Sequence, residues 1–547
     1  MNAPRVNARS TQPRHFAGQP AAPGLVFGRI VELAAQRTQQ VTKKPASAGA
    51  NPADELAQAI AEAINQLKAL MARSAAGDTR KILEFQVEFL SDPVLLEPAH
   101  AALASDADAS TAWLAAIDAQ IEEFEASTDD YFRHRTGDLR DMRARVLAIL
   151  AGVDIKPLQL PAGAILLADD LEPSRFLATS WRADHAIALR GSSPTAHVAL
   201  LARAHRVPMV VGIGNVAVPT QCNAILDGNA GTLLLEPDAD QIEGFMRARA
   251  QNDATRADND AAAAQPAVTA TGEHVKVLLN IASIDELDWI DPAICDGVGL
   301  VRTELLFAHG PPDEEQQVLF YQRILQWAGE RPVIIRTLDA GGDKPIAGVT
   351  INGETNPFLG VRGVRLSLAA PAVFKVQLRA LLRASVAGNL RVMVPMITNV
   401  EEVQRVRALI DEAAAELDAR GVTYARAPLG IMVEVPAAAL ALDTFEVDFA
   451  SVGSNDLLQY TMAAARDNPS VTPLTDPRHP GFMLLLQTIV RLAAARGLSL
   501  SLCGDLAAQP EQVPLLLSCG LRALSMPAAA VGAVKRAITR WPAPTGR

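Results

Sequence analysis

The sequence predicts a multidomain α/β protein whose second half is a closed (β/α)8 barrel. Strand-like and helix-like stretches alternate through the second half of the 547-residue chain, which is the pattern of parallel βαβ units. A long helical stretch lies nearer the amino terminus. Shorter strand and helix candidates follow it and predict a small α/β unit between the helical stretch and the barrel.

The first half divides into four segments. Residues 1–20 are rich in Asn, Arg, Gln and Pro, and we expect a disordered tail there. Residues 21–34 begin with a Pro-Gly turn and continue as a strand. Residues 35–145 hold few glycines and repeat apolar side chains at three- and four-residue spacing, which predicts a bundle of roughly four helices. Residues 146–240 return to strand and helix candidates, which suggests a small α/β unit.

The clearest linker in the chain comes next. Residues 241–271 begin as a polar helix and grade into an Asp-, Asn- and Ala-rich run that ends at Pro266. We expect this segment to be a linker helix and a hinge before the barrel, which we place at 272–547.

Eight strand candidates follow the linker, over a length that matches a TIM barrel. They are Val275–Ile281, Gly297–Arg302, Val333–Asp339, Val392–Ile397, Gly430–Val435, Phe449–Val452, Leu498–Cys503 and Leu521–Met526. Polar and charged residues gather directly after these strands. Because the carboxyl ends of the strands form one rim, where the active sites of such barrels lie, this pattern indicates a site at that rim.

Composition excludes several classes of function. The formal net charge is −11, so the chain lacks the excess of Lys and Arg by which nucleic-acid and membrane-surface binders hold phosphate groups. No apolar run is long enough to insert into a membrane, and no apolar signal sequence is evident. The four cysteines lie far apart without CxxC spacing, which fits a reducing cytoplasm better than a disulfide framework or a zinc site. We therefore expect a cytoplasmic protein with no nucleic-acid partner and no membrane insertion.

Five arginines follow predicted strand ends: Arg302, Arg336, Arg362, Arg365 and Arg466. Guanidinium groups bind phosphate and carboxylate by paired hydrogen bonds, and several of them at one mouth repel one another unless an anion is present. Any one of them alone is better explained by a salt bridge in a loop. Together they indicate an anion site.

Two acids add a candidate cation site at the same rim. Glu434 ends an apolar strand, and Asp456 follows Asn455 directly after the next strand. Two carboxylates can give a magnesium ion part of its oxygen ligands, with the remaining positions left to substrate and water. The alternative for both acids is a structural ion pair with a rim arginine.

Cys503 and His197 are the candidates for covalent and proton-transfer chemistry. Cys503 ends the seventh predicted strand, where a cysteine is either a small buried hydrophobe or, beside a positive mouth, a group with a tuned pKa that moves a proton. His197 follows a Gly/Ser/Pro turn and precedes an apolar stretch suited to a helix. The first turn of a helix favours a phosphoryl group, and a neutral imidazole is a competent nucleophile. The alternative for His197 is a cap or packing residue.

In this order the motifs resemble enzyme I of the bacterial phosphoenolpyruvate:sugar phosphotransferase system, the phosphoenolpyruvate–protein phosphotransferases. The similarity runs from about residue 21 to residue 527. The runs that carry it are specific as a set: Arg302-Thr303-Glu304, Asp339-Ala340-Gly341-Gly342-Asp343-Lys344-Pro345, Asn356-Pro357-Phe358-Leu359-Gly360, Met432-Val433-Glu434, Asn455-Asp456-Leu457 and Leu502-Cys503-Gly504.

The resemblance implies a transferase that uses phosphoenolpyruvate. His197 would become phosphorylated, and Cys503 would protonate the enolpyruvate carbon as pyruvate forms. The residues that would hold phosphoenolpyruvate are Arg302, Arg336, Arg466 and Asn455, with Arg362 lining the same mouth. The ligands of Mg²⁺ would be Glu434 and Asp456.

The resemblance also implies partners and domain roles. Residues 21–34 and 146–240 would be the swivelling phosphohistidine subdomain, and the helical segment 35–145 would dock HPr, a small histidine-containing carrier protein. HPr would receive the phosphoryl group in the first step of the sugar phosphotransferase system. The barrel would form a homodimer.

Four positions depart from the usual pattern of the family. Ala196 stands where a serine usually precedes the histidine, and Glu172 stands where a threonine is common. Asp505 shortens the usual glutamate after Cys-Gly, and Asp467 replaces a glycine. We expect activity to survive these changes with altered affinity or partner choice.

Three other interpretations remain open. A phosphoenolpyruvate synthase or pyruvate phosphate dikinase shares the barrel and the phosphohistidine domain, but it needs a nucleotide-binding domain, for which the first 150 residues are too short and helical. A non-catalytic regulatory paralogue would bind partner proteins or sense phosphoenolpyruvate, and the retained His197 and Cys503 argue against it. An enzyme of a nitrogen-related regulatory branch usually carries an additional sensory domain.

Overall fold

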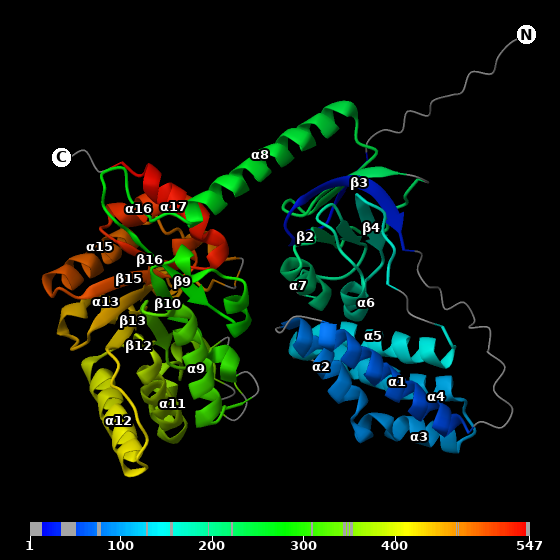
Figure 1. Ribbon diagram of the computed structural model, residues 1–547, viewed down its shortest axis with the longest axis horizontal. Coiled ribbons are helices and arrows are strands. Elements are labelled where there is room, and N and C mark those ends of the chain that lie inside the picture. Colours follow the sequence, from blue (N-terminus) through cyan, green and yellow to red (C-terminus); the bar gives the residue numbers. More distant parts are fainter. Residues whose placement is uncertain are drawn as a thin grey trace, which may run out of the picture. The chain divides into compact units, whose positions relative to one another are not determined.

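A computed structural model divides the chain into two compact units, Met1–Asp253 and Ala254–Arg547 (Figure 1). The structure describes residues 14–33, 51–73, 78–126, 130–153, 157–194, 196–219, 222–307, 310–342, 346, 349–350, 354–466, 468 and 470–542. No helix within these ranges is both long and apolar enough to cross a membrane.

The first unit is built on an eight-stranded sheet with the order β1-β8-β7-β3-β4-β5-β6-β2. Neighbours from β3 through β6 pair in parallel, and the other pairs are antiparallel. Alternate residues of β4 enter two separate apolar cores, one on each face of the sheet. The strands are β1 (Arg14–Ala17), β2 (Gln19–Ala22), β3 (Leu25–Glu32), β4 (Ala164–Ala168), β5 (Ala186–Leu189), β6 (Met209–Val211), β7 (Asn223–Asp227) and β8 (Thr232–Leu235).

The disordered tail expected over residues 1–20 is wrong from Arg14 onward, and residues 1–13 lie outside the described residues. Strand β1 pairs with β8, and β2 pairs with β6. A polar and proline-containing sequence is compatible with such edge strands, because an edge residue needs hydrogen bonds on one side only. The stability of these strands comes from their partners, which the local sequence does not reveal.

Helices form a separate bundle between β3 and β4, as the sequence predicts. The bundle has five α-helices among the described residues, where the sequence suggested roughly four, and its own core contains the fully buried Trp113. Two further helices pack against α5 from the α/β part of the unit (Figure 1). The seven helices are α1 (Pro52–Arg73), α2 (Asp78–Leu90), α3 (Glu97–Ala104), α4 (Ala109–Ala126), α5 (Asp130–Leu150), α6 (Pro173–Ala178) and α7 (His197–Ala204).

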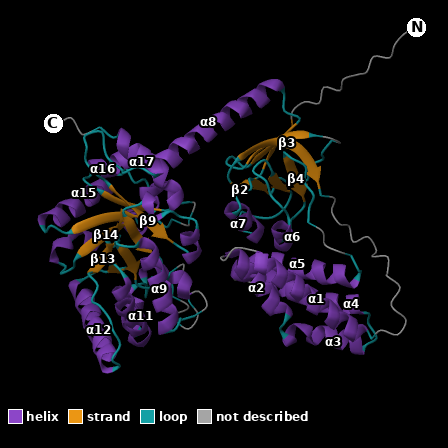
Figure 2. Cartoon of the chain, viewed as in Figure 1, coloured by secondary structure: helices purple, strands orange, loops and turns teal. Residues whose placement is uncertain are grey.

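Eight parallel strands close the second unit into a barrel, which confirms the predicted TIM barrel (Figure 2). Each strand overlaps one of the predicted strands. The strands are β9 (Lys276–Ile281), β10 (Gly297–Val301), β11 (Val333–Arg336), β12 (Leu390–Val394), β13 (Leu429–Val433), β14 (Phe449–Gly453), β15 (Ser499–Cys503) and β16 (Ala523–Met526).

Helices cover the outside of the barrel in all repeats except the first. Between β9 and β10 the chain forms only two 3-10 helices, η2 (Ile284–Asp288) and η3 (Pro292–Ile294), because this segment is short and Pro292 interrupts it. Capping boxes at Asp313 and Asn399 start two of the long helices. The α-helices are α9 (Glu314–Ala328), α10 (Val364–Ala369), α11 (Pro371–Ala384), α12 (Val400–Ala419), α13 (Pro436–Leu440), α14 (Ser454–Met462), α15 (Pro480–Ala495), α16 (Val513–Ser518) and α17 (Val531–Arg540).

Much of the expected linker is one continuous helix, α8 (Ala239–Ala263), which contains the boundary between the two units. Its carboxyl end is fastened to α17. Lys535 Nζ donates hydrogen bonds to the carbonyl oxygens of Ala263 (2.8 Å) and Gln265 (2.7 Å), and Arg536 donates to Asn259 Oδ1 (2.9 Å). The bond to Ala263 satisfies a carbonyl group that the helix end leaves without an intrahelical partner. A hinge within 241–271 stays a prediction.

Candidate functional site

The rim at the carboxyl ends of the barrel strands brings the predicted site residues together. Arg336 is the last residue of β11, Cys503 is the last residue of β15, and Glu434 follows β13 directly. Asn455 and Asp456 lie in the first turn of α14, immediately after β14. The short connections after these strands therefore fix the side chains at one end of the barrel.

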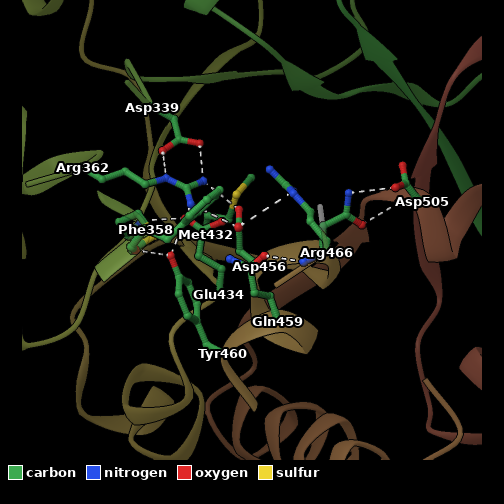
Figure 3. Close-up of polar contacts among 12 residues, drawn as sticks. Asp339, Phe358, Arg362, Met432, Glu434, Asp456, Gln459, Tyr460, Arg466 and Asp505 are labelled. Carbon is green, nitrogen blue, oxygen red and sulfur yellow. Dashed lines mark hydrogen bonds and ion pairs between the residues drawn. The ribbon is translucent and has the colours of Figure 1, made fainter. Parts of the chain in front are cut away.

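Arg362 lies at the centre of a buried ion-pair cluster (Figure 3). Its guanidinium group donates to both oxygens of Asp339, at 3.2 Å each, and to both oxygens of Asp456, at 3.2 and 2.8 Å. It also donates to the Tyr460 hydroxyl group at 3.3 Å. Arg362 is fully buried and pairs with two carboxylates at once, so it fixes the positions of Asp339 and Asp456 at the rim.

Arg336 is bound in a similar way. It pairs with Glu304, and its Nη1 lies 3.0 Å from Asp339 Oδ2. Its Nη1 also approaches the Met432 sulfur at 3.5 Å. Arg336 and Arg362 therefore form salt bridges, which is the alternative that the sequence left open for single arginines.

The other arginines lie nearer the solvent. Arg302 is exposed, and the Arg466 side chain is 34% exposed, with Nη1 3.9 Å from Asp456 Oδ1. Arg365 instead donates to the carbonyl oxygens of Leu359 and Gly360 and so holds a loop. The outer pair, Arg302 and Arg466, is therefore better placed for an incoming anion than the two buried arginines.

Glu434 is buried and accepts a 2.6 Å hydrogen bond from the backbone N–H of Met396. Burial, together with the neighbouring carboxylates of Asp456 and Asp339, raises the pKa of its carboxyl group to about 8, against the opposing effect of Arg336 and Arg362. The buried cluster thus has more carboxylates than buried arginines can neutralise.

This excess of negative charge fits a divalent cation. Among the described residues no group of three or more His, Cys, Asp and Glu side chains is arranged to hold a metal ion. Glu434 and Asp456 nevertheless supply two hard oxygen donors, and Mg²⁺ in phosphate-handling sites is commonly held by one or two carboxylates together with substrate and water. Two carboxylates therefore suit a magnesium ion that is also bound by substrate and water, and they do not suit a structural metal ion held by protein ligands alone.

Cys503 lies at the end of β15 and is 2% exposed. Burial raises the pKa of its thiol to about 11, although a hydrogen bond with Ser451 and the charge of Arg336 act in the opposite direction. The thiol group is therefore protonated at neutral pH. A protonated thiol is a potential acid, not a nucleophilic thiolate.

Asn455 is engaged by a residue that departs from the family pattern. Its amide nitrogen donates to Asp505 Oδ2 at 3.1 Å, and its amide oxygen accepts from the Asp505 backbone N–H at 2.9 Å. Figure 3 shows Asp505 reaching the site from the opposite side to Arg362. Asp467, another departure, lies outside the described residues.

His197 lies in the first unit and is the first residue of α7, as the sequence predicts. Its Nδ1 lies 3.1 and 2.9 Å from the two carboxylate oxygens of Asp138, whose side chain is fully buried in α5. Because a carboxylate can only accept, Nδ1 carries a proton, and in the neutral form of the imidazole the lone pair is therefore on Nε2. Ala196, at the N-cap position, provides no side-chain hydrogen bond to the helix.

Glu172, another departure from the family pattern, lies at the N-cap position of α6. Burial raises the pKa of its carboxyl group, and the nearby Asp141 and Asp170 raise it further, while Arg175 opposes them. Asp141 itself accepts hydrogen bonds from Ser174, which follows in α6. Asp138 and Asp141 therefore give this side of α5 two buried acids.

Asp138 and Asp339 are site residues that the sequence did not predict. Asp339 ends a predicted strand and begins the run Asp339-Ala340-Gly341-Gly342, which is one of the motifs shared with the family. Its position could therefore have suggested a role. Asp138 carries no comparable signal, because its only local pattern is a three-residue spacing from Arg135 and to Asp141, which is common on helices.

Removal of the Arg362 side chain is expected to destabilise the barrel. Arg362→Ala leaves Asp339 and Asp456 buried without their shared partner, and breaking such a pair costs about 3–5 kcal/mol. Urea unfolding of the full chain measures the loss. Arg420→Ala is the matched control, since Arg420 pairs with Glu314 at the surface and such pairs contribute at most about 1 kcal/mol. Equal effects of the two substitutions would contradict the central role of Arg362.

Comparisons with known proteins cover both units. Residues 256–542 match a family described as "PEP-utilising enzyme, PEP-binding domain". Residues 17–135 and 160–231 match the families described as "PEP-utilising enzyme, N-terminal" and "PEP-utilising enzyme, mobile domain". His197 lies within the last of these matches.

Curated relatives include phosphoenolpyruvate-protein phosphotransferases. The protein of that name from Bacillus sp. (strain S) is 35% identical over 485 residues, which cover 86% of this chain and 84% of the relative. The one from Listeria monocytogenes is 35% identical over 86% of this chain and 83% of the relative. A multiphosphoryl transfer protein from Shigella flexneri is 35% identical over 95% of this chain, which spans only 63% of that longer relative.

Proposed function

This chain belongs to the phosphoenolpyruvate–protein phosphotransferase family, and from that membership and the site geometry we propose that it transfers the phosphoryl group of phosphoenolpyruvate to His197. Pyruvate leaves, and the phosphoryl group then passes to a histidine of the carrier protein HPr. The observation that carries the proposal is the pairing of His197 Nδ1 with the buried Asp138, because it leaves Nε2 as the nucleophile.

Asp138 also supports the transfer electrostatically. As Nε2 bonds to phosphorus, the imidazole gains positive charge, which a buried carboxylate on the other ring nitrogen stabilises. The first-turn N–H groups of α7 favour the incoming phosphoryl oxygens. His197 is thus oriented for a group that arrives at its Nε2 side.

The barrel rim supports the other half of the reaction. Arg302, Arg466 and Asn455 bind the substrate anion, and the buried arginines keep the carboxylates in place. The bond from phosphorus to the enol oxygen breaks as the bond to His197 Nε2 forms. The enolate carbon then takes its proton from the Cys503 thiol, whose pKa of about 11 keeps it protonated at neutral pH.

Glu434 and Asp456 would hold Mg²⁺. When bound, the ion neutralises charge on the phosphoryl oxygens, which phosphoryl transfer requires. The rise in the pKa of Glu434 beside Asp456 and Asp339 supports this assignment, because a cation at that place would offset the excess of carboxylates.

The partner proposals rest on separate observations. Because Asp138 of the helical bundle contacts His197, a carrier protein that docks on the bundle lies beside the phosphoryl group. Leu440 on α13 and Leu484 on α15 are both more than 60% exposed on helices that pack together, which supports a homodimer through the barrel. All four cysteines are free, which supports a cytoplasmic location.

Phosphoenolpyruvate labelled in its phosphate tests the proposal. The full chain is incubated with the label and Mg²⁺, and labelled residues are mapped by mass spectrometry. We expect acid-labile label on His197 that moves to HPr when HPr is added. Label on another residue, or no label although phosphoenolpyruvate binds, would overturn the proposed reaction.

Substitution of Asp138 is expected to slow phosphorylation of His197. Asp138→Ala removes the group that fixes the ring and stabilises its charge, and losses of roughly 10–100-fold are typical when a group that orients a reacting histidine is removed. The rate of label incorporation measures the effect. Asp118→Ala is the control, since Asp118 lies in the same bundle but pairs with Arg143 at the surface. An unchanged rate in the Asp138 variant would show that Asp138 does not support the nucleophile.

A further inference from the structure

Three hydrogen bonds join the turn after β14 to the turn after β15. The Ser454 hydroxyl group donates to the Cys503 carbonyl oxygen at 2.7 Å. The Asp505 backbone N–H donates to Asn455 Oδ1 at 2.9 Å, and Asn455 Nδ2 donates to Asp505 Oδ2 at 3.1 Å. The two turns thus hold a predicted substrate ligand and the predicted acid in one connected segment of the rim.

Gly504 makes this close approach possible. Its φ of +109° lies in the region that side-chain-bearing residues rarely adopt. A Cβ atom at this position would lie 2.3 Å from the Ser454 hydroxyl oxygen and 2.7 Å from Asn455 Oδ1. A glycine between Cys503 and Asp505 therefore allows Asp505 to fold onto Asn455.

The two contacts with Asp505 determine which way the Asn455 amide faces. A backbone N–H can only donate, so the atom that it meets must be the amide oxygen. A carboxylate can only accept, so the atom that it meets must be the amide nitrogen. An amide nitrogen has two N–H bonds, and Asp505 takes one of them.

We propose that Asp505 is a positioning residue that fixes the Asn455 amide so that its second N–H is presented to the phosphoryl group of the substrate. The inference rests on the proposed function. Without the Asp505 carboxylate, only the backbone N–H of residue 505 still holds the amide, so rotation by half a turn, which presents the oxygen and repels an anion, costs less. The Asp505 carboxylate thereby favours the orientation in which Asn455 attracts the substrate.

The Asp505 carboxylate lies beside the proposed anion site, where its negative charge would repel the substrate unless it is screened. Asp505 is exposed, so water screens its charge from the substrate. Its role is to accept a hydrogen bond, which a neutral amide oxygen can also do. An asparagine at position 505 should therefore replace it.

Calorimetric titration of phosphoenolpyruvate with Mg²⁺ tests the proposal. All titrations use the full chain with His197→Ala, so that the ligand is not consumed. We expect Asp505→Ala to weaken binding about five- to tenfold, which is less than the full loss of a hydrogen bond to a charged group because the backbone N–H still holds the amide, and Asp505→Asn to stay within about threefold of the parent. Thermal unfolding of each variant checks that it is folded.

A double-mutant cycle separates positioning from a general structural effect. We expect Asp505→Ala to change affinity by less than about twofold when Asn455→Ala is already present, because no amide is left to orient. Equal weakening in both backgrounds would show that Asp505 acts without Asn455 and would overturn the proposal, as would an Asp505→Ala chain that binds normally. If the parent does not bind at all, the proposed function itself fails.

Discussion

Replacement of His197 by alanine is expected to abolish phosphorylation of the chain while phosphoenolpyruvate still binds. His197 is the group that would form the bond to phosphorus, so its loss leaves no acceptor. The groups that would hold the substrate belong to the barrel, in a different compact unit. The affinity for phosphoenolpyruvate should therefore stay within about threefold of the wild type, as for sites without shared partners.

Two measurements on the same samples check this division of labour. Label from phosphoenolpyruvate, followed by mass spectrometry, reports phosphorylation, and calorimetry reports binding. His100→Ala is the matched control, because His100 is an exposed histidine on α3 that should leave both measurements unchanged. Loss of binding in the His197 variant would contradict the assignment of substrate binding to the barrel. Remaining acid-labile label would contradict the assignment of the nucleophile.

The barrel and its rim could be predicted because their signals are local. Each strand is an apolar run followed at once by polar residues, so strand ends and candidate site residues are read from the same few positions. Glu434, Asp456 and Cys503 are predicted in this way, and all three lie at the rim, while their roles stay predictions. The start of α7 at His197 was likewise readable from the turn residues before it.

Partners that come from distant segments could not be predicted in this way. Asp138 lies 59 residues before His197, on a helix of the inserted bundle, and meets it only because the bundle packs against α6 and α7. The sequence also placed Arg362 among the substrate ligands without showing that Asp339 and Asp456 already occupy its donors. Side-chain pairing of this kind depends on how loops fold over the rim, which periodicity does not encode.

Loss of the Cys503 thiol is expected to slow pyruvate formation strongly and to weaken substrate binding little. Removal of a general acid typically lowers the rate by roughly 10²–10⁴-fold. Cys503→Ala should show that loss, because alanine has no proton to give, while the affinity for phosphoenolpyruvate changes by less than about threefold, since a thiol is a weak hydrogen-bond partner. Cys519→Ala is the matched control, because Cys519 is a buried cysteine at the end of α16 and not at the rim.

The pH dependence of the wild type gives a second test of the same role. Burial, with a smaller contribution from Glu434, raises the pKa of the thiol to about 11, against the opposing effects of Ser451, Arg336 and Arg302. The protonated form is the acid, and it persists at every pH below that pKa. The rate of pyruvate formation should therefore not fall through deprotonation of Cys503 between about pH 7 and 9. A thiol with an ordinary pKa near 8.5 would lose most of its protons over that range. A rate that falls with a midpoint near that ordinary value, and only when Cys503 is present, would mean that the thiol is not held in its protonated state by burial.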